Sequence, residues 1–183
     1  MTANRLSALD ATFLELEEAD EAAHMHIGVV MIFEPRPGTP PSLKRLRRHL
    51  ESRLGALPLY HCRLSEPHTG GLHWPSWEPD PDFRIEDQVR HAALPAPGGD
   101  AELLEWAGDY WSQRLDRGRP LWDIVLLEGL EGGRWALATK THHALVDGVG
   151  SIDVGDLVLD ASRRPRRKPA SPIDTKIAAP QLA

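Results

Sequence analysis

RWALATKTHHALVDG, residues 134–148, is the segment from which the architecture of this chain is deduced first. Its first part, residues 134–141, has the composition of a β-strand, and so does WDIVLL at residues 122–127. A glycine-rich turn at residues 131–133 lies between them, which is typical of a hairpin. We therefore predict two antiparallel strands that lead directly into two adjacent histidines.

Those two histidines should have different roles. Because side chains alternate along a strand, His142 and His143 should point in different directions. This argues against their acting together as nucleophile and base, or as two ligands of one metal. We expect His142 to be a packed or hydrogen-bonded residue. We expect His143 to be a general base, since an imidazole with an ordinary pKa of about 6.5 is mostly neutral at neutral pH.

A single histidine base is sufficient for acyl transfer from a thioester to an alcohol. The alcohol must lose its proton as it attacks, and one well-placed base accelerates such a step roughly 10²–10⁴-fold. The thiolate leaves readily because the pKa of its conjugate acid is about 8.5. Beyond the histidines, Asp147 is suited to fasten the loop, and Gly148 permits a close approach of ligand. These residues by themselves do not identify the substrate.

Composition and charge exclude several classes of protein. The chain has 183 residues, 41% hydrophobic and 26% charged, which fits one globular domain. Its net charge of −6 argues against nucleic acid as a partner. Cys62 is the only cysteine, so no internal disulfide can form and a reducing, cytoplasmic setting is expected. The sequence contains no run of ~20 apolar residues, the length that a membrane-spanning helix needs.

Periodicity and end signals predict the other elements. We expect a helix over residues 7–16, with Leu9, Phe13 and Leu16 on its buried face. Residues 25–33 are rich in β-branched side chains and predict a buried strand. The remaining predictions are helices over 42–54, from 100 (with Leu104 in its apolar face) and from 151, and extended segments over 59–64, 72–77 and 83–94. Together they predict an α/β fold, a mixed sheet with helices packed mainly on one side.

Two basic regions stand out along the chain. The predicted helix over 42–54 carries basic side chains away from its leucine stripe, either as a solvated face or as a surface for anionic lipid or the phosphates of CoA. These are Lys44, Arg45, Arg47, Arg48 and Arg53. Residues 162–183 begin with a basic, proline-rich run and predict an exposed linker, which leaves residues 1–161 as the folded domain.

The motif at the histidines resembles a known pattern. His142-His143-x-x-x-Asp147-Gly148 resembles the HHxxxDG motif of CoA-dependent acyltransferases, which include chloramphenicol acetyltransferase-like enzymes and condensation domains. The flanking segments resemble the bacterial wax ester synthase/diacylglycerol acyltransferase family, and the resemblance extends from Leu6 to about Ser162. These segments are residues 6–14, 25–28, Pro120-Leu121-Trp122 and 128–130.

This resemblance implies an O-acyltransferase that moves a fatty acyl group from acyl-CoA to diacylglycerol or a long-chain alcohol. It implies that His143 takes the proton of the acceptor hydroxyl and that Asp147 is mainly structural, turned toward an arginine. Pro120-Leu121-Trp122 would support the site and its apolar channel. Acyl-CoA would be the substrate, without a bound cofactor.

The same resemblance implies a fold and partners. The fold would be one half of a chloramphenicol acetyltransferase-like protein, a mixed sheet flanked by helices. A C-terminal half of the same enzyme, or a homo-oligomer partner, would complete the tunnel around the histidine. Peripheral contact with a membrane or lipid droplets would suit the apolar acceptors.

Two alternative functions stay open from the residues, and a metal site is disfavoured. The chain is alternatively a truncated, non-catalytic half that binds acyl-CoA or lipid and needs a partner domain for activity. A condensation-type enzyme of the same superfamily is a second alternative, although residues 6–14 and 25–28 argue against it. A metal site at His142, His143 and Asp147 is disfavoured, because no nearby cluster offers a further ligand. We therefore expect no metal.

Overall fold

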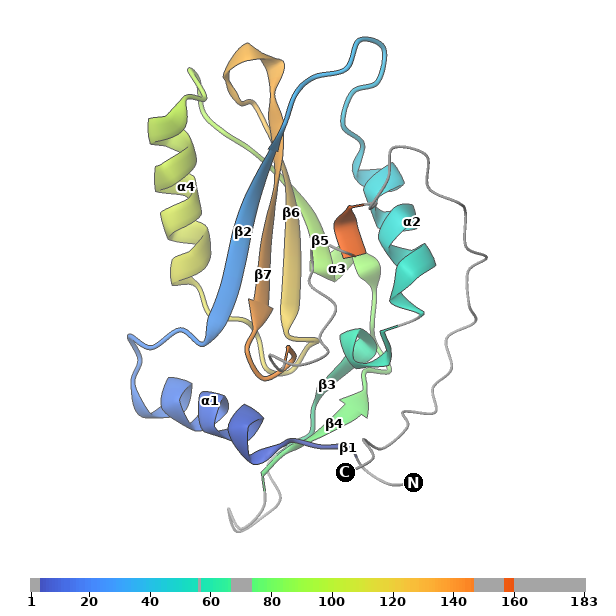
Figure 1. The fold of residues 1–183 in the computed structure, drawn as a ribbon, viewed down its shortest axis with the longest axis vertical. Helices are drawn as coiled ribbons and strands as arrows, with labels where there is room; N and C mark the ends of the chain where they lie inside the picture. Colours follow the sequence, from blue (N-terminus) through green and yellow to red (C-terminus); the bar gives the residue numbers. More distant parts are fainter. Residues whose placement is uncertain (1–3, 56, 67–73, 147–156, 160–183) are drawn as a thin grey trace.

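The computed structural model of the chain describes residues 4–55, 57–66, 74–146 and 157–159, and the strands within these ranges form two sheets (Figure 1). The larger sheet has the strand order β2 (His26–Phe33), β7 (Trp135–His142), β6 (Trp122–Glu128) and β5 (Val89–Ala93). The smaller has the order β1 (Asn4–Arg5), β4 (Ser76–Pro79) and β3 (Cys62–Leu64).

The larger sheet is mixed, as predicted. Strand β7 pairs antiparallel with both β2 and β6, while β5 and β6 are parallel. The predicted hairpin is therefore confirmed, and its turn contains the short 3₁₀ helix η2 (Glu131–Gly133). Strand β7 is the central element that carries the two histidines to one end of the sheet.

Helices cover both faces of the larger sheet, so the prediction that they pack mainly on one side is wrong. Helix α4 (Asp100–Ser112) packs its Tyr110 against Val125 and Ala138. On the other side, Leu50 of α2 (Leu43–Leu54) belongs to the cluster that contains Ile124. Figure 1 shows α4 and α2 on opposite sides of the strands. Periodicity identifies the apolar face of a helix but not the face of the sheet that it covers.

Helix α2 forms as predicted. The hydroxyl of Ser42 accepts a hydrogen bond from the backbone N–H of Arg45, and Leu50 and Leu54 are fully buried. Two of its basic residues are used inside the fold: Arg47 donates to the carbonyl of Val89, and Arg53 to that of Leu157. Part of the basic face of α2 therefore donates hydrogen bonds to the backbone of neighbouring segments. The pattern of charges in the sequence does not predict this role.

Helix α1 (Ala8–Ala19) begins where predicted but turns a different face inward. Ser7 and Asp10 form a reciprocal capping box at its start. Its buried residues are Asp10, Ala11, Leu14 and Glu17, whereas Leu9 is 58% and Leu16 48% exposed. The prediction is wrong for Leu9 and Leu16, while Phe13 is half-buried. Hydrophobic periodicity assigns carboxylates to solvent, and here Asp10 and Glu17 are buried with hydrogen-bond partners.

Strand β2 is an edge strand within the described part of the chain, so the prediction of a buried strand is also wrong. Ile27, Val29 and Ile32 are each about half exposed. On the covered face, a Cβ at Gly28 would lie 2.2 Å from Nε1 of Trp111 and 2.6 Å from the carbonyl oxygen of Thr139. Glycine is therefore required there by the close approach of the indole.

Three smaller differences complete the comparison with the predicted elements. Residues 83–94 are not uniformly extended, since α3 (Ile85–Gln88) precedes β5. A 3₁₀ helix, η1 (Pro58–His61), precedes β3 in the segment predicted to be a strand, and Leu104 on α4 is 71% exposed, not part of a buried face. The start of the helix predicted from 151 and the linker over 162–183 lie outside the described residues.

A buried lysine joins α4 to the strand that carries the histidines. Nζ of Lys140 donates 2.7 Å hydrogen bonds to the carbonyls of Tyr110 and Gln113 and lies 4.4 Å from the centroid of the Tyr110 ring. Burial lowers the pKa of Lys140 below its ordinary value. The lysine thereby satisfies carbonyls at the end of α4 and fixes that helix to β7.

In the part of the chain that is described, no helix has the length and apolar character to span a bilayer.

Candidate active site

The backbone of the histidine pair is held from two sides. The N–H of His142 donates to the carbonyl of Leu121 at 3.0 Å, and the N–H of His143 donates to the carbonyl of Met25 at 2.8 Å. The chain then turns at once, because the N–H of Leu145 donates to the carbonyl of His142 at 2.9 Å. The histidines therefore stand at a strand end that is anchored to the segments before β6 and before β2.

His142 is buried and hydrogen-bonded. It is 1% exposed, and its Nδ1 accepts a 3.0 Å hydrogen bond from the backbone N–H of Ala144. Its Nε2 lies 3.5 Å from Oε2 of Glu17. Burial lowers the pKa of His142 to about 4, and the nearby Glu17 only partly opposes this effect. The ring is neutral, since a protonated Nδ1 could not accept from Ala144.

Glu17 is the buried anion of the site. Its Oε1 accepts from the backbone N–H of Met25 at 3.3 Å, and its Oε2 accepts from Arg117 at 3.1 Å. Burial by itself raises the pKa of the carboxyl group, whereas the hydrogen bonds from Met25 and Arg117 and the positive charge of Arg117 lower it. The ion pair with Arg117 therefore favours an ionised Glu17 beside a neutral His142.

Sequence analysis missed both members of the Glu17–Arg117 ion pair. Arg117 also donates to the carbonyl of Leu14 at 2.8 Å, so it ties the segment after α4 to α1. A signal for Glu17 exists in the sequence, because it shares a helix face with Asp10 and Leu14 at the spacing i, i+4, i+7. No local signal points to Arg117, whose contact depends on tertiary structure.

His143 has a different environment. Its ring stacks on that of Phe13 with centroids 4.9 Å apart and an interplanar angle of 25°. It is half-buried, whereas the preceding histidine is almost fully enclosed. The predicted divergence of the two rings is thus confirmed in their contacts. The accessible ring has an apolar aromatic neighbour, which suits a site for an apolar substrate.

Pro120-Leu121-Trp122 is buried next to the histidine pair. Leu121 and Trp122 are 0% and 1% exposed, and the Trp122 indole donates to the carbonyl of Tyr60 at 2.8 Å. The side-chain amide of Gln88 donates to the carbonyls of Pro120 and Trp122, at 2.8 Å and 2.7 Å. The carbonyl between them, that of Leu121, is the one that receives the His142 N–H. Asp147 and Gly148 lie outside the described residues.

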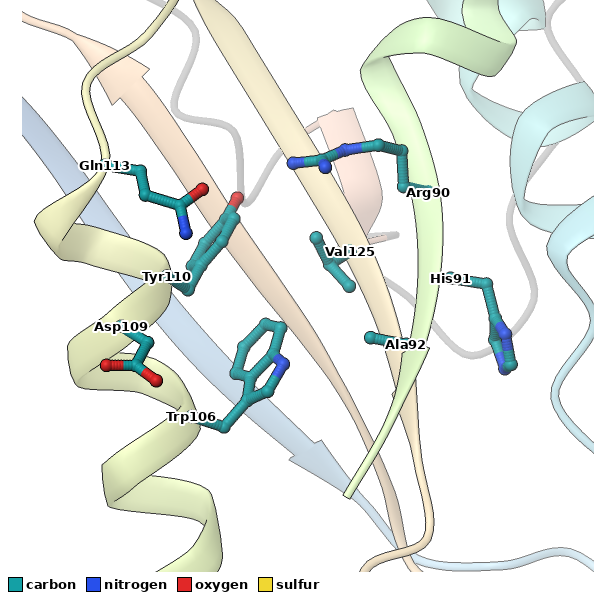
Figure 2. Close-up of a pocket in the computed structure, with 8 residues that line it drawn as sticks. All are labelled: Arg90, His91, Ala92, Trp106, Asp109, Tyr110, Gln113 and Val125. Atoms are coloured by element: carbon teal, nitrogen blue, oxygen red, sulfur yellow. The ribbon is translucent and has the colours of Figure 1, made fainter. Parts of the chain in front are cut away.

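A separate cavity of about 300 Å³ lies between α4 and β5. Figure 2 shows Trp106 and Tyr110 projecting from α4 toward Arg90 and Val125 on the sheet. Arg90 is paired with Asp123 there, and neither histidine of the motif lines the cavity. Among the described residues, no group of histidine, cysteine and acidic side chains is arranged to hold a metal ion.

Solved structures define the class of fold. The chain is similar to the first condensation domain of the calcium-dependent antibiotic synthetase, with a TM-score of 0.60, 18% identity and coverage of 78% of this chain and 34% of that chain. At that identity the likeness concerns the fold alone. The architecture is one half of the chloramphenicol acetyltransferase-like fold, as expected.

Sequence comparison then defines the family. Residues 6–181 match the wax ester synthase/diacylglycerol acyltransferase catalytic domain, and the chain belongs to this family. It is similar to the wax ester synthase/diacylglycerol acyltransferase of Marinobacter aquaeolei VT8, with 36% identity, a TM-score of 0.65 and coverage of 79% of this chain and 35% of that chain.

Curated relatives agree with this assignment. A protein named probable diacylglycerol O-acyltransferase tgs3, from Mycobacterium tuberculosis, is 42% identical over 170 residues, which are 93% of this chain and 60% of the relative. Another named tgs1, from the same species, is 38% identical over 149 residues, 81% of this chain and 31% of the relative. The chain therefore spans between about a third and 60% of these relatives.

Proposed function

We propose that this chain supplies the general base of an acyl-CoA-dependent O-acyltransferase whose acceptor is diacylglycerol or a long-chain alcohol. The observation that carries the proposal is the contrast within the histidine pair. His142 is enclosed and neutral, while His143 is half-buried on a fixed backbone and faces an aromatic ring. The family and the names of its members support the choice of substrates.

In this mechanism His143 removes the proton of the acceptor hydroxyl as the oxygen attacks the thioester carbonyl. The C–O bond forms, the C–S bond of acyl-CoA breaks, and the thiolate of CoA takes up the proton that the imidazole had accepted. The protein residues position and move the proton, and no metal or bound cofactor is needed. Asp147 and Gly148 would hold the loop after the histidines.

The partners follow from the same proposal. Exposed Ile27 and Val29 on β2 provide an apolar face near the strand end that carries the site. A C-terminal half of the same enzyme, or a second copy of the chain, would cover this face and complete the tunnel, including donors for the oxyanion. We place the protein in the cytoplasm, in peripheral contact with a membrane or lipid droplets that hold the acceptor.

The test is an assay with radiolabelled palmitoyl-CoA and diacylglycerol, with the chain alone and with an added C-terminal half. We expect His143→Ala to lower triacylglycerol formation by roughly 10²–10⁴-fold, the contribution of one general base. His91→Ala is the matched control. His91 is a surface residue of β5 that is paired with Glu128 of β6. Full activity of the His143 variant would refute the base assignment.

The same assay separates the alternative, a half that only binds acyl-CoA or lipid. This alternative is considered because the chain matches only 60% and 31% of the length of the two relatives. Retention of palmitoyl-CoA on the isolated chain, without product until the second half is added, would support a binding role for this half alone. Product from the isolated chain would contradict it.

A further inference from the structure

We infer that Glu17 is a positioning residue that selects the tautomer of His142 and, through it, shapes the turn that carries His143. The tautomer and the turn are properties of the folded chain. Only the last link, from the turn to the rate of acyl transfer, rests on the proposed function.

The first step concerns the proton on the His142 ring. Its Nδ1 accepts the backbone N–H of Ala144 at 3.0 Å, so Nδ1 carries no hydrogen. A neutral imidazole with a free Nδ1 must carry its hydrogen on Nε2. That atom is buried and has no hydrogen-bond partner among the described residues, and Oε2 of Glu17 lies 3.5 Å from it.

The second step concerns why Glu17 can select this tautomer. An ionised carboxylate only accepts hydrogen bonds, so it stabilises the ring with hydrogen on Nε2 and not the alternative. Arg117 and the N–H of Met25 hold the carboxylate in its charged form and in place. A glutamine at this position could donate as well as accept, and it would remove the preference.

The third step connects both oxygens of Glu17 to the backbone on either side of His143. Oε2 leads through the His142 ring to the N–H of Ala144. Oε1 accepts from the N–H of Met25, whose carbonyl receives the N–H of His143. The carboxylate of Glu17 is therefore connected to two contacts next to the proposed base. One is the hydrogen bond from Ala144 to the His142 ring, and the other is the hydrogen bond from His143 to the carbonyl of Met25.

The direct test is nuclear magnetic resonance of the full chain labelled with ¹⁵N-histidine. The His142 signal is assigned by its loss in His142→Asn. We expect wild type to show hydrogen on Nε2 only, and Glu17→Gln to show a mixture of tautomers. Exchange of the Ala144 amide should become about tenfold faster in Glu17→Gln, as one buried hydrogen bond is released. Glu18→Gln is the matched control, since Glu18 is a 79%-exposed neighbour that also approaches Arg117.

Two variants of His142 isolate the critical atom. The amide of asparagine occupies the place of Nδ1 and can accept from Ala144, whereas that of glutamine occupies the place of Nε2 and faces Glu17. In the enzyme reconstituted with a C-terminal half, we expect His142→Asn to retain at least about tenfold more kcat than His142→Gln. Glu17→Gln should lower kcat with little change in the KM for palmitoyl-CoA, and should have no further effect in the His142→Asn background, which has no tautomer to select.

Hydrogen on Nδ1 of His142 in wild type would overturn the inference, and this measurement needs no variant to fold. Unchanged Ala144 exchange in a folded Glu17→Gln chain, or equal kcat for the two His142 variants, would overturn it as well. These outcomes leave the His143→Ala test untouched. Conversely, an active His143→Ala enzyme would refute the proposed base and leave the tautomer measurement valid.

Discussion

His142 and His143 are adjacent in the chain, yet one is enclosed beside Glu17 and the other is open against Phe13. Their separation could be predicted from the sequence because alternation is a local property of any strand. The surroundings of His142 could not. Burial of Glu17 depends on an arginine that is distant along the chain, and the usual rule places acidic side chains in water.

The burial of neutral His142 makes the stability of the fold depend on pH. Its pKa is about 4 in the folded chain and 6.5 ordinarily, so between these values the unfolded state binds more protons. Stability from this residue is complete above about pH 6.5 and falls as pH decreases toward about 4, by roughly 1 kcal/mol per pH unit.

Urea unfolding near pH 7 and near pH 5 measures this effect. We expect wild type to lose more stability between the two conditions than His142→Asn, which has no imidazole at this position. The comparison cancels contributions from the other histidines, including His26 and His61, whose pKa values are also lowered by burial. Equal losses in the two proteins would show that His142 is not the buried neutral group described.

Among the elements, the β6–β7 hairpin and α2 were predictable because their signals lie within the segment itself. Strand β2 was also predictable as a strand, but its edge position was not, since its apolar sequence is compatible with either a central or an edge position. Its register on β7 and its exposure are set by the topology of the whole sheet. The inward face of α1 was missed for a related reason, because the buried carboxylate of Glu17 is stabilised by Met25 and Arg117, which lie outside the helix.

Two glycines provide a matched test of the packing between β2 and α4. Gly28→Ala should destabilise the fold by about 1–3 kcal/mol, because the added Cβ would overlap the Trp111 indole and the Thr139 carbonyl. Gly108→Ala, in the interior of α4, should stabilise it by about 0.5–1 kcal/mol, since its Cβ meets nothing within 4 Å and alanine favours helix. Thermal unfolding of both variants measures these changes. Similar stability for both would contradict the close approach at Gly28.

At the scale of the molecule, the sequence was sufficient to predict a mixed sheet with helices but not their distribution over two faces. Strands β6 and β7 are buried between α4 and α2, whereas β2 keeps Ile27 and Val29 half exposed. Burial of such an edge would stabilise an assembly with the second half that the proposal requires.

Polar substitution on β2 tests that assembly. We expect Ile27→Thr with Val29→Thr to leave the thermal midpoint of the isolated chain within about 3 °C, because both side chains already contact water. Binding of an added C-terminal half, measured by sedimentation, should weaken roughly tenfold or more. Leu104→Ser is the control, because Leu104 is an exposed apolar residue on α4 and not on β2. Unchanged binding by the double variant would remove β2 from the interface.

The ion pair between Glu17 and Arg117 also bears on the order of folding. It joins residues 100 positions apart, while the β6–β7 hairpin is closed by a short turn. Long-range contacts form after local ones, because the entropy lost in closing a large loop opposes them. During synthesis α1 leaves the ribosome long before Arg117 exists to neutralise its buried acid. We therefore expect the surroundings of His142, which depend on this ion pair, to form after the β6–β7 hairpin.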